Sequence, residues 1–343
     1  MPRSPSAPSL LLSRSCREDG AQQLQLALSS GSALPPLRLA VVGHVEWVEF
    51  LAVDQLPRPG AIGHALRSLQ EPAGGGAVVA AQMARLQQQP VQFFTALGRD
   101  SVGEACVKRL EDLGLEVHVA WREVPTRRGV SMVDGEGDRA ITVIGERLTP
   151  SLDDDLPWEA LGQCEGLFVT AADAPLLKAC RSAAVLAATP RVRLPVLQQA
   201  GVPLDALIGS GLDPGERVES GQLNPAPHTV ICTEGAAGGV SHPGGRYDPS
   251  PLPGPLVESY GCGDSFAAGV VTRVLRRAGP WRRPSRWVPS VVPPVRRDLG
   301  PMDECSPRAM ALNIDKNALK YLLLWRPQKE RSLPHRQAGL PSR

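Results

Sequence analysis

The chain has 343 residues, of which 42% are hydrophobic and 21% are charged, and its formal net charge at neutral pH is +2. This length and composition can bury a sizeable core, so we expect a folded protein of enzyme size. The longest apolar runs are far shorter than the ~20 residues of a membrane-spanning helix, which argues against an integral membrane protein.

The cysteines and histidines show no metal or disulfide pattern. Seven cysteines are scattered without C-x-x-C spacing, and the six histidines are equally dispersed. These distributions argue against a disulfide scaffold and against a zinc or iron centre held by the protein. We expect a reducing compartment, the cytoplasm, while the Ser- and Arg-rich start of the chain leaves organelle targeting open.

Residues 1–37 are expected to form a disordered extension or a transit segment. Beyond them, short β-rich runs alternate with helical patterns. The expected strands lie at 37–42, 91–95, 129–133, 140–144, 167–170 and 229–232. The expected helices lie at 78–87, 103–113, 175–187 and 265–276. Such alternation predicts a mostly parallel sheet covered by helices on both faces, and the turn at 134–138 predicts a hairpin.

The last part of the chain has a different composition. Residues 276–343 hold fifteen Lys and Arg against five Asp and Glu, whereas the preceding residues hold 22 basic and 30 acidic side chains. Proline is frequent, and only residues 313–325 have a helical pattern. We expect a loosely packed, solvated tail with one short amphipathic helix, and this interpretation is favoured over a nucleic-acid-binding segment.

A glycine turn carries the main chemical signal. In Gly261-Cys262-Gly263-Asp264 the glycines let backbone N–H groups converge, and the helix that follows adds its positive dipole end. This arrangement predicts an anion hole, and Asp264 is placed to take a proton from a hydroxyl that attacks a bound phosphate. An ordinary helix N-terminus with an acidic first turn is the alternative for so short a motif.

Two segments in the expected order resemble the signatures of the ribokinase-like (PfkB) carbohydrate kinases. They are residues 261–269 and residues 72–86, which contain a glycine run and an alanine-rich helix ending in Arg-Leu. Residues 96–103 also resemble a G-x-D-x-x-G turn of the family. The resemblance implies an α/β three-layer fold with a central, mostly parallel sheet and a small β lid. It places the kinase domain at 38–277, the lid at about 44–70 and 125–147, and a non-family tail at 278–343.

The same resemblance assigns roles to individual residues. Asp264 is the expected base, and Gly261, Cys262 and Gly263 the expected anion hole. The residues expected to contact ATP are Thr233, Gly235 and Gly238. The expected substrate contacts are Glu46, Gly75, Gly76, Asp100 and Arg139. Indirect Mg²⁺ binding is assigned to Ser210, Asp213 and Glu216, which stand where relatives carry an N-x-x-E pattern.

The chain also departs from the family pattern. Val78 replaces an asparagine that often contacts the sugar, Glu258 replaces an aspartate beside a monovalent-cation site, and nothing after about Arg277 resembles the family's closing helices. We expect ATP-dependent phosphorylation of a hydroxyl on a sugar or sugar-like molecule, with Mg²⁺ as cofactor. Activation by a monovalent cation and assembly into a homodimer are open alternatives. A nucleoside kinase, or a catalytically weak member that binds or regulates, are the alternatives.

Overall fold

The computed structural model describes residues 37–249 and 260–278. The N-terminal segment, Glu258 and the basic tail, for which the sequence makes predictions, lie outside the described residues. None of the helices in the described part of the chain is both long and apolar enough to cross a membrane.

The larger of two sheets has nine strands in the order β13-β12-β11-β10-β9-β8-β1-β4-β5. Its strands are β1 (Leu39–Val42), β4 (Val91–Gly98), β5 (Leu115–Arg122), β8 (Gly166–Val169), β9 (Val185–Ala188), β10 (Ala206–Ser210), β11 (Thr229–Thr233), β12 (Gly239–His242) and β13 (Gly245–Tyr247). Every pairing is parallel except those of β12 with β11 and with β13. The predicted fold class, a mostly parallel α/β sheet, is therefore confirmed.

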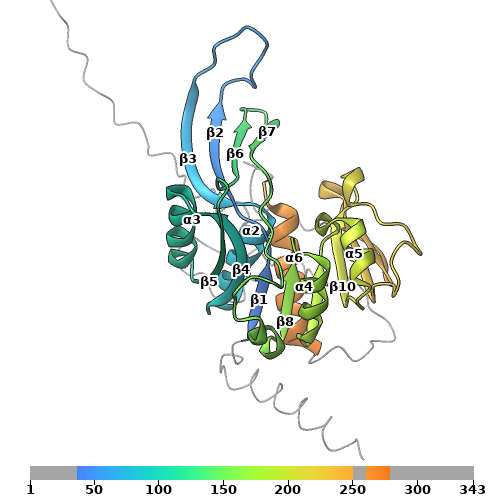
Figure 1. The fold of residues 1–343 in the computed structure, drawn as a ribbon. Coiled ribbons are helices and arrows are strands. Elements are labelled where there is room, and N and C mark those ends of the chain that lie inside the picture. The colour runs from blue at the N-terminus through green and yellow to red at the C-terminus, as the bar shows by residue number, and fades with distance from the viewer. Residues whose placement is uncertain (1–36, 250–259, 279–343) are drawn as a thin grey trace, which may run out of the picture. The chain divides into compact units, whose positions relative to one another are not determined.

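The second sheet is smaller and stands at the top of the view in Figure 1. It has the order β3-β2-β6-β7. Its strands are β2 (Glu46–Val53), β3 (Ala65–Ala73), β6 (Arg128–Val133) and β7 (Arg139–Ile144). The predicted hairpin is confirmed, because β6 and β7 pair antiparallel on either side of the turn at 134–138.

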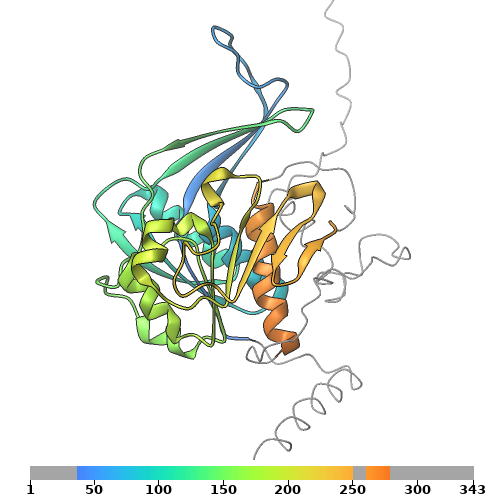
Figure 2. The same ribbon diagram turned by 90° about the vertical axis from the view of Figure 1, so that its right-hand side faces the viewer.

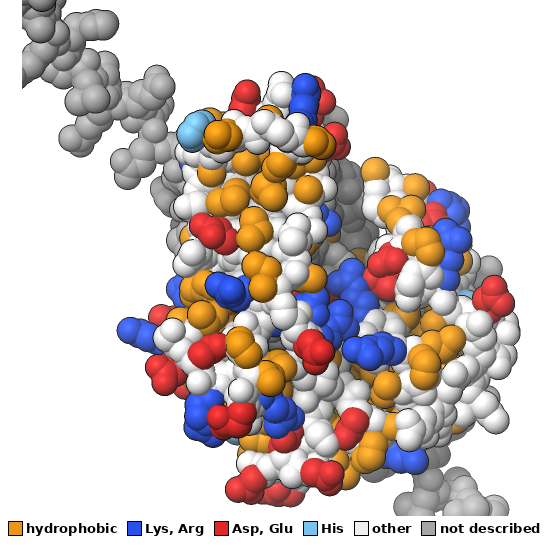
Figure 3. All heavy atoms as spheres, turned by 45° about the horizontal axis from the view of Figure 1, so that its top comes forward, with side chains coloured by type: hydrophobic (Ala, Val, Ile, Leu, Met, Phe, Trp, Pro, Cys, Tyr) orange, Lys and Arg blue, Asp and Glu red, His pale blue; other side chains and the backbone are white. Residues whose placement is uncertain are grey.

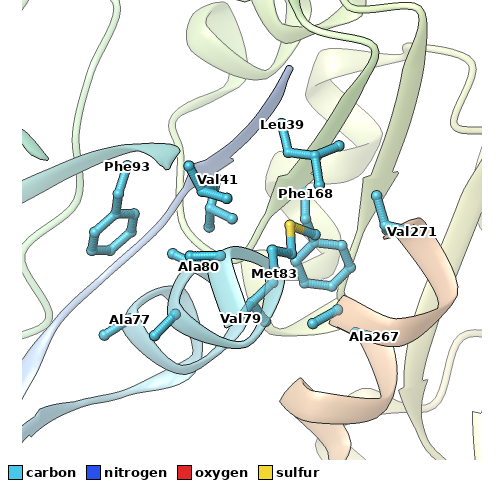
Figure 4. Packing of buried hydrophobic residues seen from close by; sticks show 14 of the residues in the cluster. Leu39, Val41, Ala77, Val79, Ala80, Met83, Phe93, Phe168, Ala267 and Val271 are labelled. Atoms are coloured by element: carbon cyan, nitrogen blue, oxygen red, sulfur yellow. The ribbon is translucent and has the colours of Figure 1, made fainter. Parts of the chain in front are cut away.

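Helices cover both faces of the larger sheet, as the alternation of its buried residues requires. They are α2 (Gly75–Gln87), α3 (Ser101–Asp112), α4 (Ala174–Ala179), α5 (Leu194–Ala200) and α6 (Cys262–Ala278). Because successive strand residues face opposite ways, Leu39 and Val41 pack toward α2 and α6, while Ala40 and Val42 pack toward α4 and α5. Figure 4 shows the first of these clusters, where Met83 of α2 lies near Phe168 of β8. Figure 2 shows the same layers from the side.

Two elements differ from those expected. The helix expected at 175–187 is wrong in its second half, because α4 ends at Ala179 and β9 begins at Val185. Residues 185–188 are small and apolar, a pattern that is compatible with a helix or a strand. They form a strand because they are fully buried between β8 and β10. No strand was predicted at 46–53, where the structure has β2, which begins at Glu46.

The end of β1 and the start of α2 touch backbone to backbone. A Cβ added to Gly43 would lie 2.8 Å from the Cα of Gly76, and a Cβ added to Gly76 would lie 2.7 Å from the carbonyl oxygen of His44. Real Cβ atoms do not approach backbone atoms so closely, so both positions require glycine for close packing. This contact sets the position of the first turn of α2.

We predict that Gly76→Ala destabilises the fold. Alanine would gain at most about 1 kcal/mol in helix propensity. Against this, the overlap with the rigid backbone of Gly43 and His44 should cost about 1–3 kcal/mol, as overpacking of a core does. The measurement is the free energy of unfolding in urea. Gly135→Ala is the control, because a Cβ there meets nothing within 4 Å; equal stability of the two variants would contradict the prediction.

Candidate active site

The candidate site lies at the carboxyl ends of the parallel strands. The chain leaves β1 at Gly43 and His44, β9 at Thr189 to Arg191, and β10 at Ser210. Parallel strands end at one edge of a sheet, so these segments come together there, and open α/β sheets generally bind ligands outside that edge. The first turn of α6 is brought to the same place.

Asp264 sits in the first turn of α6, which begins at Cys262. Gly261 has a φ of +71°, a left-handed conformation that glycine adopts without strain, and its carbonyl accepts from the amide of Ser265 at 2.8 Å. The amides of Gly263 and Asp264 precede the first helical hydrogen bond, so they have no partner within the helix. Gly263 is exposed and faces open space. The turn has the donors and the dipole end that suit an anion.

The two predicted signatures meet at the carboxylate of Asp264. A Cβ added to Gly75 would lie 3.1 Å from Asp264 Oδ1, so the start of α2 passes directly beside this carboxylate. Burial raises the pKa of Asp264, the positive charge of Arg191 opposes that effect, and the negative charge of Glu216 adds to it. A carboxylate with a raised pKa is a better proton acceptor than an exposed one.

The backbone of the glycine turn before α2 is held by two side chains. The amide of Gly75 donates to His44 Nε2 at 3.4 Å, and the amide of Gly74 donates to the hydroxyl of Tyr260 at 3.0 Å. Burial and the neighbouring arginines, among them Arg147 and Arg127, lower the pKa of His44 well below its usual value. A neutral His44 is the form whose Nε2 can accept, so His44 supports the turn.

Glu46 is buried beside the same turn. Its Oε1 lies 2.9 Å from Arg127 Nε and 3.8 Å from His44 Nε2. The contact with Arg127 is close enough for an ion pair, although the Nε–H does not point well enough for a hydrogen bond. Burial raises the pKa of Glu46, and Arg127 partly opposes the rise. The carboxylate therefore lies near Asp264 but already has a cationic neighbour.

The predicted metal residues form a loop that is tied to Arg191. Glu216 accepts from Arg191 Nε, and its other oxygen accepts from the amide of Ser210 at 2.9 Å. Burial alone would lower the pKa of Arg191, but the carboxylates of Asp264 and Glu216 raise it. Asp213 is exposed, and one of its oxygens accepts from Gly215 at 2.8 Å. Glu216 is thus committed to Arg191, while Asp213 keeps a free oxygen.

No group of three or more His, Cys, Asp or Glu side chains in the described ranges could hold a metal by itself. Mg²⁺ in kinases usually keeps water and binds one or two carboxylates together with substrate phosphates. The exposed carboxylate of Asp213 and the hydroxyl of Ser210 fit that weaker requirement.

The predicted nucleotide loop follows β11 and lies next to this loop. Thr233 Oγ1 donates to the carbonyl of Gly209 at 3.4 Å, and a Cβ on Gly211 would lie 3.3 Å from Glu234 Cγ. Gly238 has a φ of +82°, and a Cβ there would overlap the backbone around Tyr247. Gly238 is therefore required by the turn between β11 and β12, and Gly235 begins the short helical turn within it.

Two predicted substrate residues have contacts within the protein. Asp100 caps α3, where it accepts from the Gly103 amide at 2.7 Å, and it also accepts from the amide and hydroxyl of Thr126 at 2.8 Å each. This carboxylate orders the turn before the small sheet, and its contact with substrate stays a prediction. Arg139 is exposed on β7, with its guanidinium 5.8 Å from the ring centre of Tyr260.

Val78 has a packing role. A Cβ added to Gly261 would lie 3.0 Å from Val78 Cγ1, and Val78 is buried. Val78, which replaces an asparagine of the family pattern, thus packs α2 against the turn that begins α6.

The sequence analysis missed the arginines of this region. A cavity of about 720 Å³ has arginine as its main polar lining, and its wall includes Arg127, Arg147, Arg191 and Arg193. Figure 3 shows blue side chains gathered in the central hollow below the small sheet. The Thr189-Pro190-Arg191 segment after a strand was a signal for one of them, but no local pattern relates residues 127 and 147 to residues 191 and 193.

Comparisons with solved structures find ribokinase-like folds. The ribokinase of Thermotoga maritima is 19% identical, with 71% of this chain and 88% of that chain covered and a TM-score of 0.56. Arabidopsis thaliana ribokinase, solved with ribose and ATP, is 17% identical over 71% and 87%, with a TM-score of 0.55. Phosphofructokinase-2 of Escherichia coli, solved with fructose-6-phosphate, is 15% identical over 72% and 89%, with a TM-score of 0.52. At these identities the likeness establishes the fold.

The comparison with curated proteins gives no significant match. The family models give one, in which residues 37–210 match the pfkB family of carbohydrate kinases. This match spans half of the chain, agrees with the fold and includes the glycine turn before α2, at residues 74–76. The chain belongs to the PfkB family of carbohydrate kinases.

Proposed function

We propose that this protein transfers the γ-phosphoryl group of ATP to a hydroxyl of a sugar or sugar-like molecule, with Asp264 as the base. The main supporting observation is that Asp264, in the first turn of α6, lies beside Gly75 at the carboxyl edge of the sheet. Membership of the carbohydrate kinase family supports the reaction type. The small sheet formed by β2, β3, β6 and β7 would then cover the acceptor as a lid.

Proton transfer is assigned to Asp264. The acceptor hydroxyl would give its proton to the Asp264 carboxylate while its oxygen bonds to the γ-phosphorus and the bond to the leaving ADP oxygen breaks. Burial that raises the pKa of Asp264 favours this step, and the positive charge of Arg191 keeps a usable fraction of the carboxylate ionised.

Charge stabilisation is assigned to the α6 turn. The amides of Cys262 and Gly263 would donate to the oxygens of the transferring phosphoryl group, where negative charge is concentrated. The loop from Thr233 to Gly238 would contact the rest of the nucleotide phosphates, since it lies beside Ser210 on the same edge. Ser210 and Asp213, together with water, would hold Mg²⁺, which would supply positive charge that offsets part of the phosphate charge.

We predict that Asp264→Asn lowers kcat by about 10² to 10⁴-fold, because a positioned general base typically contributes that much. The amide has the same shape, so unfolding in urea should change little. The assay is ADP release with ATP, Mg²⁺ and a panel of sugars and sugar phosphates. Asp112→Asn, at the exposed end of α3, is the control and should keep full activity. A kcat near that of the wild type in Asp264→Asn would rule out the assigned base.

The pH profile should shift in opposite directions in two variants. The base must be ionised, so kcat should fall as pH drops through the raised pKa of Asp264. Arg191 lowers this pKa and Glu216 raises it. Arg191→Gln should therefore move the acid limb to higher pH, and Glu216→Gln should move it to lower pH. The measurement is kcat against pH for both variants and the wild type, and acid limbs that coincide, or that move the same way, would contradict the assignment.

A further inference from the structure

The lining of the arginine cavity contains four arginines and one carboxylate, that of Glu146. Glu46 pairs with Arg127 and Glu216 pairs with Arg191. No carboxylate of the described residues forms an ion pair with Arg147 or Arg193. Glu146 also lines the cavity, is exposed, and forms no ion pair with these arginines in residues 37–249 and 260–278. The guanidinium groups of Arg147 and Arg193 are therefore available to pair with an anion.

Segments from distant parts of the chain hold these arginines together. Arg127 precedes β6 and its carbonyl accepts from the amide of Trp47 at 2.9 Å. Arg147 follows β7 and donates to the carbonyl of Arg191 at 3.1 Å. Like charges repel, and burial together with the neighbouring arginines lowers the pKa of Arg147. A cavity lined by four such groups and a single carboxylate is suited to an external anion.

The backbone at Arg193 supports a functional reading. Its φ is +85°, a region that residues other than glycine rarely adopt. Strained backbone of this kind clusters at binding sites, where it fixes the direction of a side chain. Here it belongs to an arginine that lines the cavity.

We propose that Arg127, Arg147, Arg191 and Arg193 bind a phosphate group that the acceptor already carries, so that the substrate is a sugar monophosphate or a similar phosphorylated polyol. This inference rests on the proposed kinase function. Arg147 and Arg193, which form no ion pair in the described residues, can pair with a phosphate, and guanidinium forks bind its oxygens in pairs. The cavity volume of about 720 Å³ is in the range of pockets for small ligands.

The position of the cavity indicates that the bound phosphate belongs to the acceptor sugar and not to the nucleotide. Arg127 and Arg147 flank the strands β6 and β7 of the small sheet, whereas the loop assigned to the nucleotide follows β11. In the sheet order β9 and β10 separate β8 from β11, and Arg191 and Arg193 follow β9. Arg191 also lies near enough to Asp264 to affect its pKa, so a phosphate held here would leave the rest of the acceptor near the base.

The test compares binding in the full-length protein by calorimetry without ATP. The probes are fructose 6-phosphate and ribose 5-phosphate, each against its neutral parent sugar, and inorganic phosphate. We expect a sugar phosphate to bind at least about 10-fold more tightly than its parent. Each charged hydrogen bond that is lost should cost about 10- to 100-fold in affinity, so Arg147→Gln and Arg193→Gln should each weaken that probe by this factor.

Arg128→Gln is the matched control, because Arg128 is the exposed neighbour of Arg127 on β6 and does not line the cavity. It should leave all affinities unchanged. Circular dichroism checks the fold of each variant, and Arg193→Lys, which keeps the charge, should retain part of the binding. Tripolyphosphate affinity in Mg²⁺ separates an acceptor site from a nucleotide site.

The proposal is overturned if no phosphorylated probe binds, if neutral sugars bind equally well, or if Arg147→Gln and Arg193→Gln weaken only tripolyphosphate. Turnover separates this result from the kinase assignment. If a neutral sugar is turned over, if turnover requires Asp264, and if Arg147→Gln and Arg193→Gln do not change it, the kinase assignment stands and the phosphate site is rejected. Arginine-dependent binding of a sugar phosphate without any turnover would leave the phosphate site and remove the kinase.

Discussion

The candidate site depends on one steric constraint, the backbone contact between the end of β1 and the start of α2. Gly43 and Gly76 allow this approach because neither carries a Cβ. The contact places Gly75 against the carboxylate of Asp264, which belongs to a helix almost two hundred residues later in the chain. Val78, one turn further along α2, then packs on Gly261 and fixes the other side of the junction.

Neighbouring arginines favour the ionised form of the buried carboxylates at the contact between α2 and α6. Asp264 lies near enough to Glu46 and to Glu216 for their charges to interact, and burial alone would raise the pKa of a carboxylate in such a place. The arginines offset this effect, Arg127 beside Glu46 and Arg191 beside Glu216 and Asp264. Four arginines and one carboxylate line the cavity, and Arg191 connects the proposed base with the proposed site for a phosphorylated acceptor.

The sequence predicted the features that depend on local geometry. The glycine turn at Gly261 to Asp264, the α2 signature and the β6–β7 hairpin all need particular residues at fixed spacing, so a linear pattern reveals them. The boundary between α4 and β9 could not be predicted, because Val185 to Ala188 are small and apolar, and their burial between two strands decides their conformation. Asp100 was predicted to contact substrate. Its cap of α3 through the Gly103 amide is a local bond, but its bonds to Thr126 form only because the tertiary structure brings Thr126 to it.

The arginine cavity shows the limit of pattern reading most clearly, since its residues come from both sides of the small sheet and from the turn after β9. The most direct test of the account is phosphorus NMR of the protein with ATP, Mg²⁺ and sugar monophosphates. The account predicts a new phosphomonoester signal that grows as the γ-phosphorus signal of ATP decays, and that is lost in Asp264→Asn. Loss of ATP signal to inorganic phosphate alone, or no reaction with any acceptor, would contradict it.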